Sequence, residues 1–397
     1  MISVQQATDI VLQHPYAPRV TRVPLREAVN CVLATPVQAD RDFPPFDRVA
    51  MDGIAIRYDE WRNGTRVFKI VGTQAAGAPR QRLSDATSCM EVMTGAVLPE
   101  GTDTVIRYED VVINNGEATV ADVSVEKGGS IHHRGVDVRE GAVLLQPGQR
   151  ISPAEIALMA SVGKTAVDIK AFPRAALIST GDELVDVASV PGPFQIRRSN
   201  TEALWAALRS MHVPAETWHL RDDPDEIQAG IIEIVKSSDV IILSGGVSKG
   251  RFDYVPAALE AAGFRKHFHQ VSQRPGKPFW FGSDDQGRVA FALPGNPVST
   301  FMCFYRYVKP WLLRSLGVKH VRASAVLAED FSFAPALTFF LQVRTEVKDG
   351  QLLAWPVVGG GSGDFANLAH VDGFLELPLE KTAFRAGEVL PFIPFRA

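Results

Sequence analysis

The chain has 397 residues, of which 46% are hydrophobic and 22% are charged, and its formal net charge is -4. This apolar content supports packed cores and excludes a disordered chain, and the slightly acidic balance argues against a nucleic-acid binder. At this length we expect about two to four domains.

The three cysteines, Cys31, Cys89 and Cys303, lie far apart and form no CxxC pair. Their number and spacing predict neither a zinc site nor a disulfide framework, and they favour a reducing, cytoplasmic compartment. The first residues lack the order of a signal peptide, and no apolar run is long enough to cross a bilayer. We therefore expect no membrane association.

The N-terminal region predicts a helix followed by extended chain. Ser3 is placed to cap a helix that ends near His14, and residues 23–28 form a second, short helical segment. Residues 30–42 read as extended and lead to a proline-rich joint at 43–46.

Residues 55–138 predict a strand-rich insertion, because short alternating runs are cut by glycines. A helix then begins at Ser152-Pro153 and is closed by Gly163, and a strand follows at 165–169.

Several polar residues around this insertion occupy predicted turns: Asp52, Thr94, His132, His133, Arg134 and Asp137. An Asx-type turn before glycine accounts for Asp52 on its own. Adjacent histidines point apart on a strand, which favours two ordinary loop histidines over a paired metal site. Arg134 and Asp137 either bind an anionic ligand or pair with each other.

From residue 174 short buried strands alternate with helices. The predicted strands are 175–180, 215–220, 240–243, 264–271, 278–282 and 289–293. The predicted helices are 201–212, with Ser199-Asn200 as its cap, 225–236, 255–262 and 298–315. This alternation predicts an α/β domain with a parallel, doubly wound sheet.

Four polar loops follow strands of this sheet, at 179–183, 221–223, 244–253 and 294–299. Because ligands bind at the carboxyl ends of strands in open α/β sheets, this shared position predicts a site. In the loop 244–253, Ser244, Gly245, Gly246, Ser248, Gly250 and Asp253 favour a phosphate or nucleotide loop, with free glycine amides facing the anion, over a plain turn. The chain has neither a Walker P-loop nor a serine-hydrolase elbow.

From about residue 319 the pattern returns to strands, at 323–327, 339–347, 352–358, 374–377 and 389–392. The glycine run 359–364 is either a flexible linker or a loop that approaches a ligand. Loop carboxylates, together with Arg274 and Lys277 around Pro275-Gly276, suit an anionic ligand held with a divalent cation such as Mg²⁺.

Seven motifs in this order resemble the MoeA-type molybdopterin molybdenumtransferases, the family that includes the gephyrin E domain. They are Ala50-Met51-Asp52-Gly53, Met93-Thr94-Gly95-Ala96, Arg134-Gly135-Val136-Asp137, Ser179-Thr180-Gly181-Asp182-Glu183-Leu184, Ser244-Gly245-Gly246-Val247-Ser248 with Gly250 and Asp253, Pro275-Gly276-Lys277-Pro278, and Leu293-Pro294-Gly295-Asn296-Pro297-Val298-Ser299. The resemblance covers essentially the whole chain.

The resemblance implies an elongated α/β plus β subunit in four parts that forms a homodimer. Residues 1–42 with 139–172 form an N-terminal helix and linker domain, 43–138 a β-rich insertion, 173–318 a MogA-like α/β domain and 319–397 a C-terminal β-barrel-like domain. It also implies that the enzyme inserts molybdate into adenylylated molybdopterin with Mg²⁺ and releases AMP. The molybdopterin adenylyltransferase is a further expected partner, and nucleic acid is not expected.

Residue by residue, the resemblance implies three groups of site residues, with Asp52 and Thr94 reaching the partner's pocket. The catalytic group is Asp52, Thr94, Asp137, Glu183, Asp222, Asp253 and Lys277. The substrate-binding group is Ser244, Gly245, Gly246, Ser248, Gly250, Arg274, Pro294, Gly295, Asn296, Pro297, Ser299, Arg344 and Ser362, and Lys277, Ser299 and Ser362 form its molybdate side. The metal ligands are Asp182, Glu183 and Asp253.

The chain departs from the family pattern at three positions. Ile54 stands where the family has tyrosine, Arg274 where it has lysine, and Gln342 where it has an arginine. Arg344, two residues further along the same strand, is the candidate replacement for that arginine. Two alternatives to the transferase are an ATP-dependent molybdopterin adenylyltransferase, which usually has Gly-Gly-Thr-Gly at 245–248, and a non-catalytic scaffold that retains the fold.

Overall fold

The computed structural model describes residues 1–247, 254–319 and 321–396. The chain forms two compact units. The first comprises Met1–Ala34, Gly148–Ser152 and Ala166–Ala397, and the second comprises Thr35–Pro147 and Pro153–Thr165. Within the described ranges, no helix combines the length and the apolarity needed to cross a membrane.

A six-stranded sheet in the order β17-β14-β18-β22-β21-β19 forms the centre of the first unit. Its strands are β14 (Ala175–Thr180), β17 (Ala215–Leu220), β18 (Val240–Ser244), β19 (Arg265–Gln270), β21 (Pro278–Ser283) and β22 (Val289–Leu293). Strands β17, β14, β18 and β22 run parallel, as predicted. The prediction of a wholly parallel sheet is wrong at β21, which is antiparallel to both its neighbours. The link from β21 to β22 is a short turn, and a parallel pair would need a much longer crossover.

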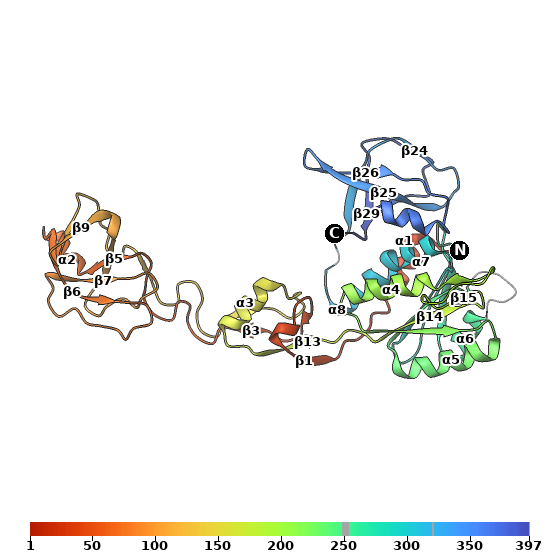
Figure 1. Ribbon diagram of the computed structural model, residues 1–397, viewed down its shortest axis with the longest axis horizontal. Coiled ribbons are helices and arrows are strands. Elements are labelled where there is room, and N and C mark those ends of the chain that lie inside the picture. The colour runs from red at the N-terminus through yellow and green to blue at the C-terminus, as the bar shows by residue number, and fades with distance from the viewer. Residues whose placement is uncertain (248–253, 320, 397) are drawn as a thin grey trace. The chain divides into compact units, whose positions relative to one another are not determined.

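Helices cover both faces of this sheet (Figure 1). One face packs against α1 (Val4–Leu12), α4 (Ser199–Ser210), α7 (Pro297–Cys303) and α8 (Lys309–Leu316), and the other packs against α5 (Pro224–Ser237) and α6 (Val255–Ala261). The strand side chains alternate accordingly: Leu177 and Ile242 belong to the first core and Ile178 and Leu243 to the second. A π-helical segment, η3 (Phe304–Val308), joins α7 to α8.

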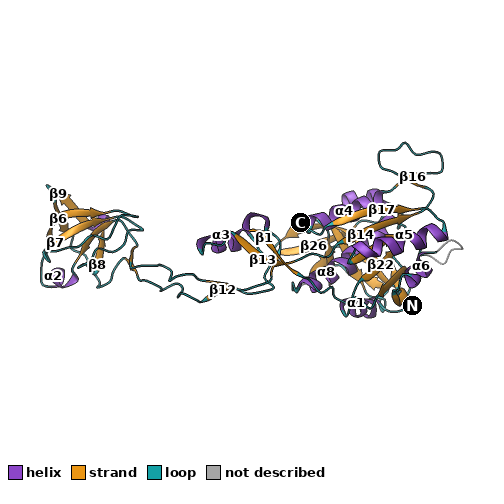
Figure 2. Cartoon of the chain, turned by 90° about the horizontal axis from the view of Figure 1, so that it is seen from below, coloured by secondary structure: helices purple, strands orange, loops and turns teal. Residues whose placement is uncertain are grey.

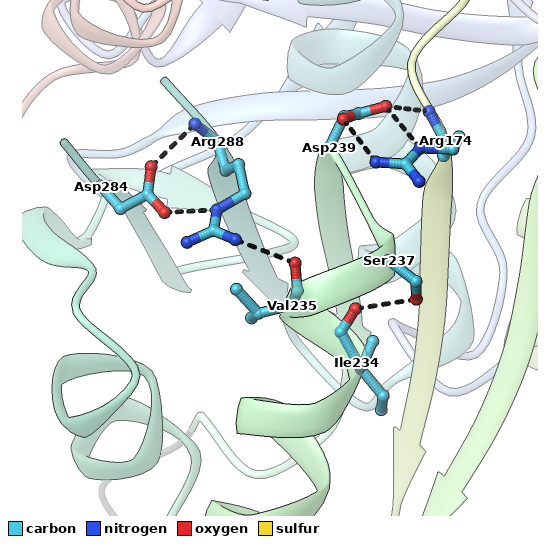
Figure 3. A network of polar contacts seen from close by, with 7 residues as sticks. All are labelled: Arg174, Ile234, Val235, Ser237, Asp239, Asp284 and Arg288. Atoms are coloured by element: carbon cyan, nitrogen blue, oxygen red, sulfur yellow. Dashed lines mark hydrogen bonds and ion pairs between the residues drawn. The ribbon is translucent and has the colours of Figure 1, made fainter. Parts of the chain in front are cut away.

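Ion pairs fasten the amino ends of the parallel strands (Figure 3). The backbone N–H and the guanidinium of Arg174, just before β14, donate to Asp239, just before β18, at 2.9–3.1 Å. Arg288, just before β22, bonds Asp284 and donates to the carbonyl of Val235 in α5 at 3.0 Å. The opposite, carboxyl edge carries the polar loops.

The C-terminal strands close into a barrel. They are β23 (Ala323–Leu327), β25 (Thr338–Lys348), β26 (Gln351–Pro356), β27 (Gly373–Leu377) and β29 (Val389–Pro394), and β25 pairs with both β26 and β27. The short strand β20 (Gln273–Arg274), which follows β19, pairs with β25. This pairing brings Arg274 of the α/β domain beside the barrel. The segment between β26 and β27 also contacts the α/β domain, because its 3-10 helix η4 (Phe365–His370) packs against α7.

Smaller elements complete the first unit. They are β1 (Val20–Pro24), η1 (Leu25–Glu27), β2 (Val32–Leu33), β13 (Ala166–Lys170), β15 (Leu184–Val185), β16 (Ile196–Arg197), β24 (Phe331–Ser332) and β28 (Ala383–Phe384). Strands β1, β13 and β2 form one sheet. Helix α1 buries Val4, Ala7 and Val11 in the core of the α/β domain.

Strands dominate the second unit (Figure 2). Its six-stranded sheet contains β5 (Gly53–Ile56), β6 (Val67–Gln74), β7 (Ser88–Val92), β8 (Thr104–Arg107), β9 (Val111–Asn114) and β10 (Glu117–Val120). Two ribbons pair β4 (Arg48–Val49) with β11 (Ile131–His132) and β3 (Val37–Gln38) with β12 (Val143–Leu145). Helix α3 (Pro153–Ser161) begins at its proline as predicted, whereas α2 (Tyr58–Arg62) and η2 (Tyr108–Asp110) interrupt a segment that the sequence predicted to be all β.

Candidate active site

The polar loops after β14, β17, β18 and β22 meet at the carboxyl edge of the sheet, as predicted. They surround a cavity of about 560 Å³. Its lining includes Ser179, Thr180, Gly181, Glu183, Arg197, Arg198, Asn200, Asp222, Ser244, Gly245, Gly246, Pro278, Pro294, Gly295, Asn296 and Pro297. The described part of the loop after β18 ends at Val247, so Ser248, Gly250 and Asp253 lie outside the described residues.

Close packing between two of these loops explains their glycines. Gly246 has φ +66°, and a Cβ there would lie 2.6 Å from Val255 Cγ2 and 3.0 Å from Thr180 Oγ1. The hydroxyl of Thr180 is buried and has no hydrogen-bond partner among the described residues. A buried hydroxyl without a hydrogen-bond partner destabilises the folded state, and the two glycines of the β18 loop lie directly over this one.

The sequence predicted free amides on both glycines of the β18 loop, and the structure corrects this at Gly245. Its N–H donates to the carbonyl of Leu293, the last residue of β22, at 3.2 Å. This bond continues the pairing of β18 with β22, so the N–H of Gly245 is not free to bind an anion.

Carboxylates gather where β14 and β17 end. A Cβ on Gly181 would lie 2.5 Å from Glu183 Oε2, so the Glu183 carboxylate lies directly against this glycine. The backbone N–H of Asp222 donates to Asp182 Oδ1 at 3.2 Å. Burial, followed by the charges of Glu183 and Asp182, raises the pKa of Asp222. A bound cation would relieve this repulsion.

Asn200 is a site residue that sequence reasoning missed. Its Nδ2 donates to Ser244 Oγ at 2.8 Å and to the carbonyl of Gly295 at 2.7 Å, which links the loops after β18 and β22. The predicted role of Ser199-Asn200 as a helix cap is wrong, because α4 begins at Ser199 after Arg198 and has no side-chain cap bond. Periodicity could not reveal this role, because both partners lie at least 44 residues away.

A second cavity, of about 190 Å³, lies where the barrel meets β20 and α7. Arg274, Ser362 and Gln342 line it, and Arg274 is its only charged lining residue among those described. The Ser362 hydroxyl accepts from Asn296 Nδ2 at 2.7 Å, which connects the glycine run to the loop after β22. The glycine run is therefore a loop built into the barrel and not a flexible linker.

Three residues expected at this anion site have other positions. Lys277 and Arg344 are exposed, Ser299 is buried in α7, and none of them is among the described residues that line the cavity. Gln342, which stands where the family has arginine, faces the cavity and accepts from Asn367 Nδ2 at 3.3 Å.

In the second unit the structure joins Asp52 to Thr94. The backbone N–H and the hydroxyl of Thr94 donate to Asp52 Oδ1 at 2.6 and 2.8 Å. These bonds, the backbone one first, hold the pKa of Asp52 below its usual value. Asp52 is therefore a fixed carboxylate and not merely a turn former.

Asp137 of the same unit is held by a histidine. His132 Nε2 lies 3.0 Å from Asp137 Oδ1, and His132 Nδ1 lies 3.1 Å from Arg48 Nη2. Arg134 instead bonds Asp42 at 2.7 Å, so the predicted alternative of an Arg134–Asp137 pair is wrong. Among the described residues, no three His, Cys, Asp or Glu side chains are arranged to hold a metal ion.

Comparisons with known proteins agree with this architecture. Three family models match the chain: the MoeA N-terminal region (domains I and II) at residues 2–163, a probable molybdopterin-binding domain at 176–314 and the MoeA C-terminal region (domain IV) at 324–395. The molybdopterin molybdenumtransferase of Synechocystis is 40% identical over 99% of both chains. That of Bacillus subtilis is 31% identical over 94% of this chain and 89% of the relative.

Solved structures show the same likeness. Two structures of the molybdopterin biosynthesis MoeA protein from Pyrococcus horikoshii superpose with a TM-score of 0.85 over the full length of both chains, at 29% and 25% identity. The chain belongs to the MoeA family of molybdopterin molybdenumtransferases, enzymes of molybdenum cofactor biosynthesis.

Proposed function

We propose that this chain inserts molybdate into adenylylated molybdopterin and releases AMP with the help of Mg²⁺. The observation that carries the proposal is the cavity at the carboxyl edge of the sheet, whose lining combines the carboxylates of Glu183 and Asp222 with the guanidinium of Arg198. The adenylylated substrate contains a phosphoanhydride that joins two phosphates, and its recognition requires hydrogen-bond donors together with charge neutralisation.

The carboxylates present fit Mg²⁺ in complex with such a substrate. Mg²⁺ binds through one or two protein carboxylates together with phosphate oxygens and water, so it needs no cage of three protein ligands. We propose that the one or two protein carboxylates of this site come from Asp182, Glu183, Asp222 and Asp253, the last of which lies outside the described residues. When bound, Mg²⁺ supplies neutralisation of the negative charge on the phosphoanhydride oxygens.

The second cavity is the proposed molybdate site. A tetrahedral oxyanion requires cationic and hydroxyl donors, and Arg274 and Ser362 supply one of each. A neutral amide, Gln342, completes the polar lining, so we propose that this chain holds molybdate less tightly than a relative with arginine at that position.

Asp52, Thr94 and Asp137 belong to the second unit, and we propose that a homodimer supplies them to the site of the partner. Their support is the hydrogen bonding that fixes both carboxylates, neither of which forms an ion pair with a lysine or arginine among the described residues. The free cysteines Cys31, Cys89 and Cys303 support a cytoplasmic location, where the molybdopterin adenylyltransferase would deliver the substrate.

The experiment that tests the proposal is chromatographic detection of AMP released from adenylylated molybdopterin, with Mg²⁺, in the presence and absence of molybdate. We expect release that depends on molybdate. ATP-dependent formation of adenylylated molybdopterin by the chain alone, with no molybdate-dependent release, would support the adenylyltransferase instead.

A further inference from the structure

The turn that carries Arg274 into the second cavity is held from inside the protein. It runs from Val271 to Lys277, and its ends meet because the N–H of Val271 donates to the carbonyl of Lys277 at 3.0 Å. Within the turn, Gln273 is buried, whereas Arg274 is exposed and lines the cavity. Successive side chains of a strand point to opposite sides, so fixing Gln273 in β20 also fixes the direction in which Arg274 leaves the backbone.

Gln273 uses both ends of its side-chain amide. Its Nε2 donates to the carbonyl of Gly276 at 2.9 Å, which closes the turn from within, and its Oε1 accepts from the hydroxyl of Tyr307. Because a carbonyl can only accept, the bond to Gly276 determines which end of the amide is nitrogen and leaves the oxygen for Tyr307. If the hydroxyl of Tyr307 were removed, this buried oxygen would keep no donor among the described residues, which is unfavourable.

Tyr307 is itself firmly held. Its side chain is 1% exposed, and its ring packs against Phe279 of β21 with ring centroids 4.9 Å apart. It lies in η3, the π-helical segment between α7 and α8, and such single turns inside longer helices are frequent at functional sites. Burial raises the pKa of Tyr307, so the hydroxyl keeps its proton and remains a donor.

The turn also packs directly on α7. Gly276 has φ +87°, and a Cβ there would lie 2.7 Å from Cys303 Sγ and 2.9 Å from Gln273 Nε2. Gln273 Nε2 lies 3.5 Å from the same sulfur. The turn therefore has no room to move toward the helix, and the bonds of Gln273 prevent it from moving away.

The orientation of Arg274 matters for the second cavity. Arg274 is its only charged lining residue among those described, and the guanidinium lies over the ring of Phe333, with 5.9 Å between Cζ and the ring centroid. A guanidinium presents its donors in a planar fork, so its binding of an oxyanion depends on direction, whereas a lysine ammonium acts as a point charge on a flexible stem. An arginine at this position therefore needs a more rigid support than a lysine.

We propose that Tyr307 and Gln273 are positioning residues that orient Arg274 toward the molybdate oxyanion. The proposal rests on the proposed function, in which the second cavity holds molybdate. Neither Tyr307 nor Gln273 is among the described residues that line this cavity, so both act through the turn.

Calorimetric titration of the full-length protein with sodium molybdate tests the proposal. Tyr307→Phe removes the hydroxyl and keeps the buried ring, and we expect it to weaken molybdate binding by roughly fivefold, as the loss of one hydrogen bond does. Thr8→Val is the matched control, because the buried hydroxyl of Thr8 accepts from Arg306, the neighbour of Tyr307, at 3.0 Å. It should lower the melting temperature as Tyr307→Phe does and bind molybdate like the wild type.

Arg274→Lys gives a second readout. Because the ammonium is less directional, adding Tyr307→Phe to Arg274→Lys should weaken molybdate binding by less than about twofold. A purely structural role for Tyr307 would give the same loss whether residue 274 is arginine or lysine.

Unchanged molybdate binding in Tyr307→Phe would overturn the positioning role, as would an equal loss in Thr8→Val or equal losses with arginine and lysine at position 274. Gly276→Ala pushes a methyl group against Gln273 Nε2, so it reports on the same turn if Tyr307→Phe does not fold. Weaker molybdate binding in Gly276→Ala would support the positioning role, and wild-type binding would overturn it.

The outcome is separable from that of the transferase. Molybdate-dependent AMP release with the wild-type KM for molybdate in Tyr307→Phe would leave the transferase and remove the positioning role. The expected loss of molybdate affinity in Tyr307→Phe, with no AMP release by the wild type, would do the reverse. A wild-type protein that binds no molybdate would remove both.

Discussion

The backbone amide of Asp222 donates to the carboxylate of Asp182 at 3.2 Å, across the ends of the neighbouring strands β17 and β14. This bond holds two acidic loops together although their charges repel, and with burial that repulsion raises the pKa of Asp222. A carboxyl group whose pKa is raised by folding destabilises the folded state once the pH exceeds its value in the unfolded chain.

The first prediction concerns the repulsion between Asp222 and its neighbouring carboxylates, Glu183 and Asp182. Asp222→Asn removes the charge, so at pH 7 in EDTA we expect its melting temperature to equal or exceed that of the wild type. Mg²⁺ should raise the melting temperature of the wild type more than that of the variant, because the variant lacks one of the carboxylates that bind the ion and therefore binds it more weakly. Calorimetry with and without Mg²⁺ measures both shifts, and equal responses of the two proteins to Mg²⁺ would count against this carboxylate as a ligand.

The second prediction concerns Gly246. Gly246→Ala strains a left-handed residue and pushes a methyl group against Val255, and Gly287→Ala is its matched control, with φ +80° and nothing within 4 Å. In the control, Gly287→Ala, backbone strain alone should lower the free energy of unfolding by about 1–2 kcal/mol. In Gly246→Ala, the clash with Val255 should lower the free energy of unfolding by roughly 1–3 kcal/mol more. Urea unfolding measures both, and equal losses would show that the two loops do not pack as closely as described.

The third prediction concerns the protonation of His132. Arginine can only donate, so His132 Nδ1 must accept from Arg48, and Nε2 must carry the proton that it donates to Asp137. The ¹⁵N chemical shifts of the imidazole should therefore report a proton on Nε2 and none on Nδ1, and Arg48→Gln should relax this preference. His133, whose Nδ1 contacts Asp47, is the internal comparison. A protonated Nδ1 in His132 would refute the arrangement.

The fourth prediction concerns the amino edge of the sheet. Burial opposes ionisation of Asp239, but the hydrogen bonds from Arg174 outweigh it and hold its pKa below the usual 3.8. The resulting stability is present above the unfolded value and is lost as the pH falls through the lower, folded value. At pH 7, Asp239→Asn should lower the free energy of unfolding, measured in urea, by about 1.5–3 kcal/mol. The difference in this free energy between wild type and variant should shrink below about pH 4.

Asp285→Asn is the control for this measurement. Asp285 is 98% exposed and its nearest Arg265 nitrogen lies 3.6 Å away, so its loss should not exceed about 1 kcal/mol. Similar losses in the two variants would contradict the assignment of stability to the Arg174–Asp239 pair.

The fifth prediction concerns the molybdate cavity. Gln342→Arg adds a second guanidinium beside Arg274 and should tighten molybdate binding by about tenfold, measured by calorimetry. Gln351→Arg, on an exposed position of the same barrel, adds the same charge away from the cavity and should change little. If both variants tighten binding equally, net charge and not the cavity would be responsible.

The comparison of sequence and structure shows what periodicity can reveal. Alternating buried strands and helices located β14, β17, β18 and β22, and so placed four polar loops at one edge, because a parallel strand always ends at the same side as its neighbours. The reversal of β21 escaped prediction, since a buried strand has the same pattern in either direction.

Contacts between distant residues were also beyond the sequence. Asn200 read as a cap because Asn favours helix starts, and only the fold brings Ser244 and Gly295 to its side chain. Alternation put Gln342 and Arg344 on one face of β25, but this long strand extends past the second cavity, so only Gln342 lines it.

The central claim is that the carboxyl-edge cavity performs the molybdate-dependent release of AMP. The most direct test is the rate of that release as Mg²⁺ is titrated, for wild type, Asp222→Asn and Asp225→Asn, an exposed neighbour in the first turn of α5. We predict that Asp222→Asn needs more Mg²⁺ and releases AMP at least about tenfold more slowly, since one charged interaction is lost, while Asp225→Asn matches the wild type. A wild-type Mg²⁺ dependence in Asp222→Asn would contradict the account.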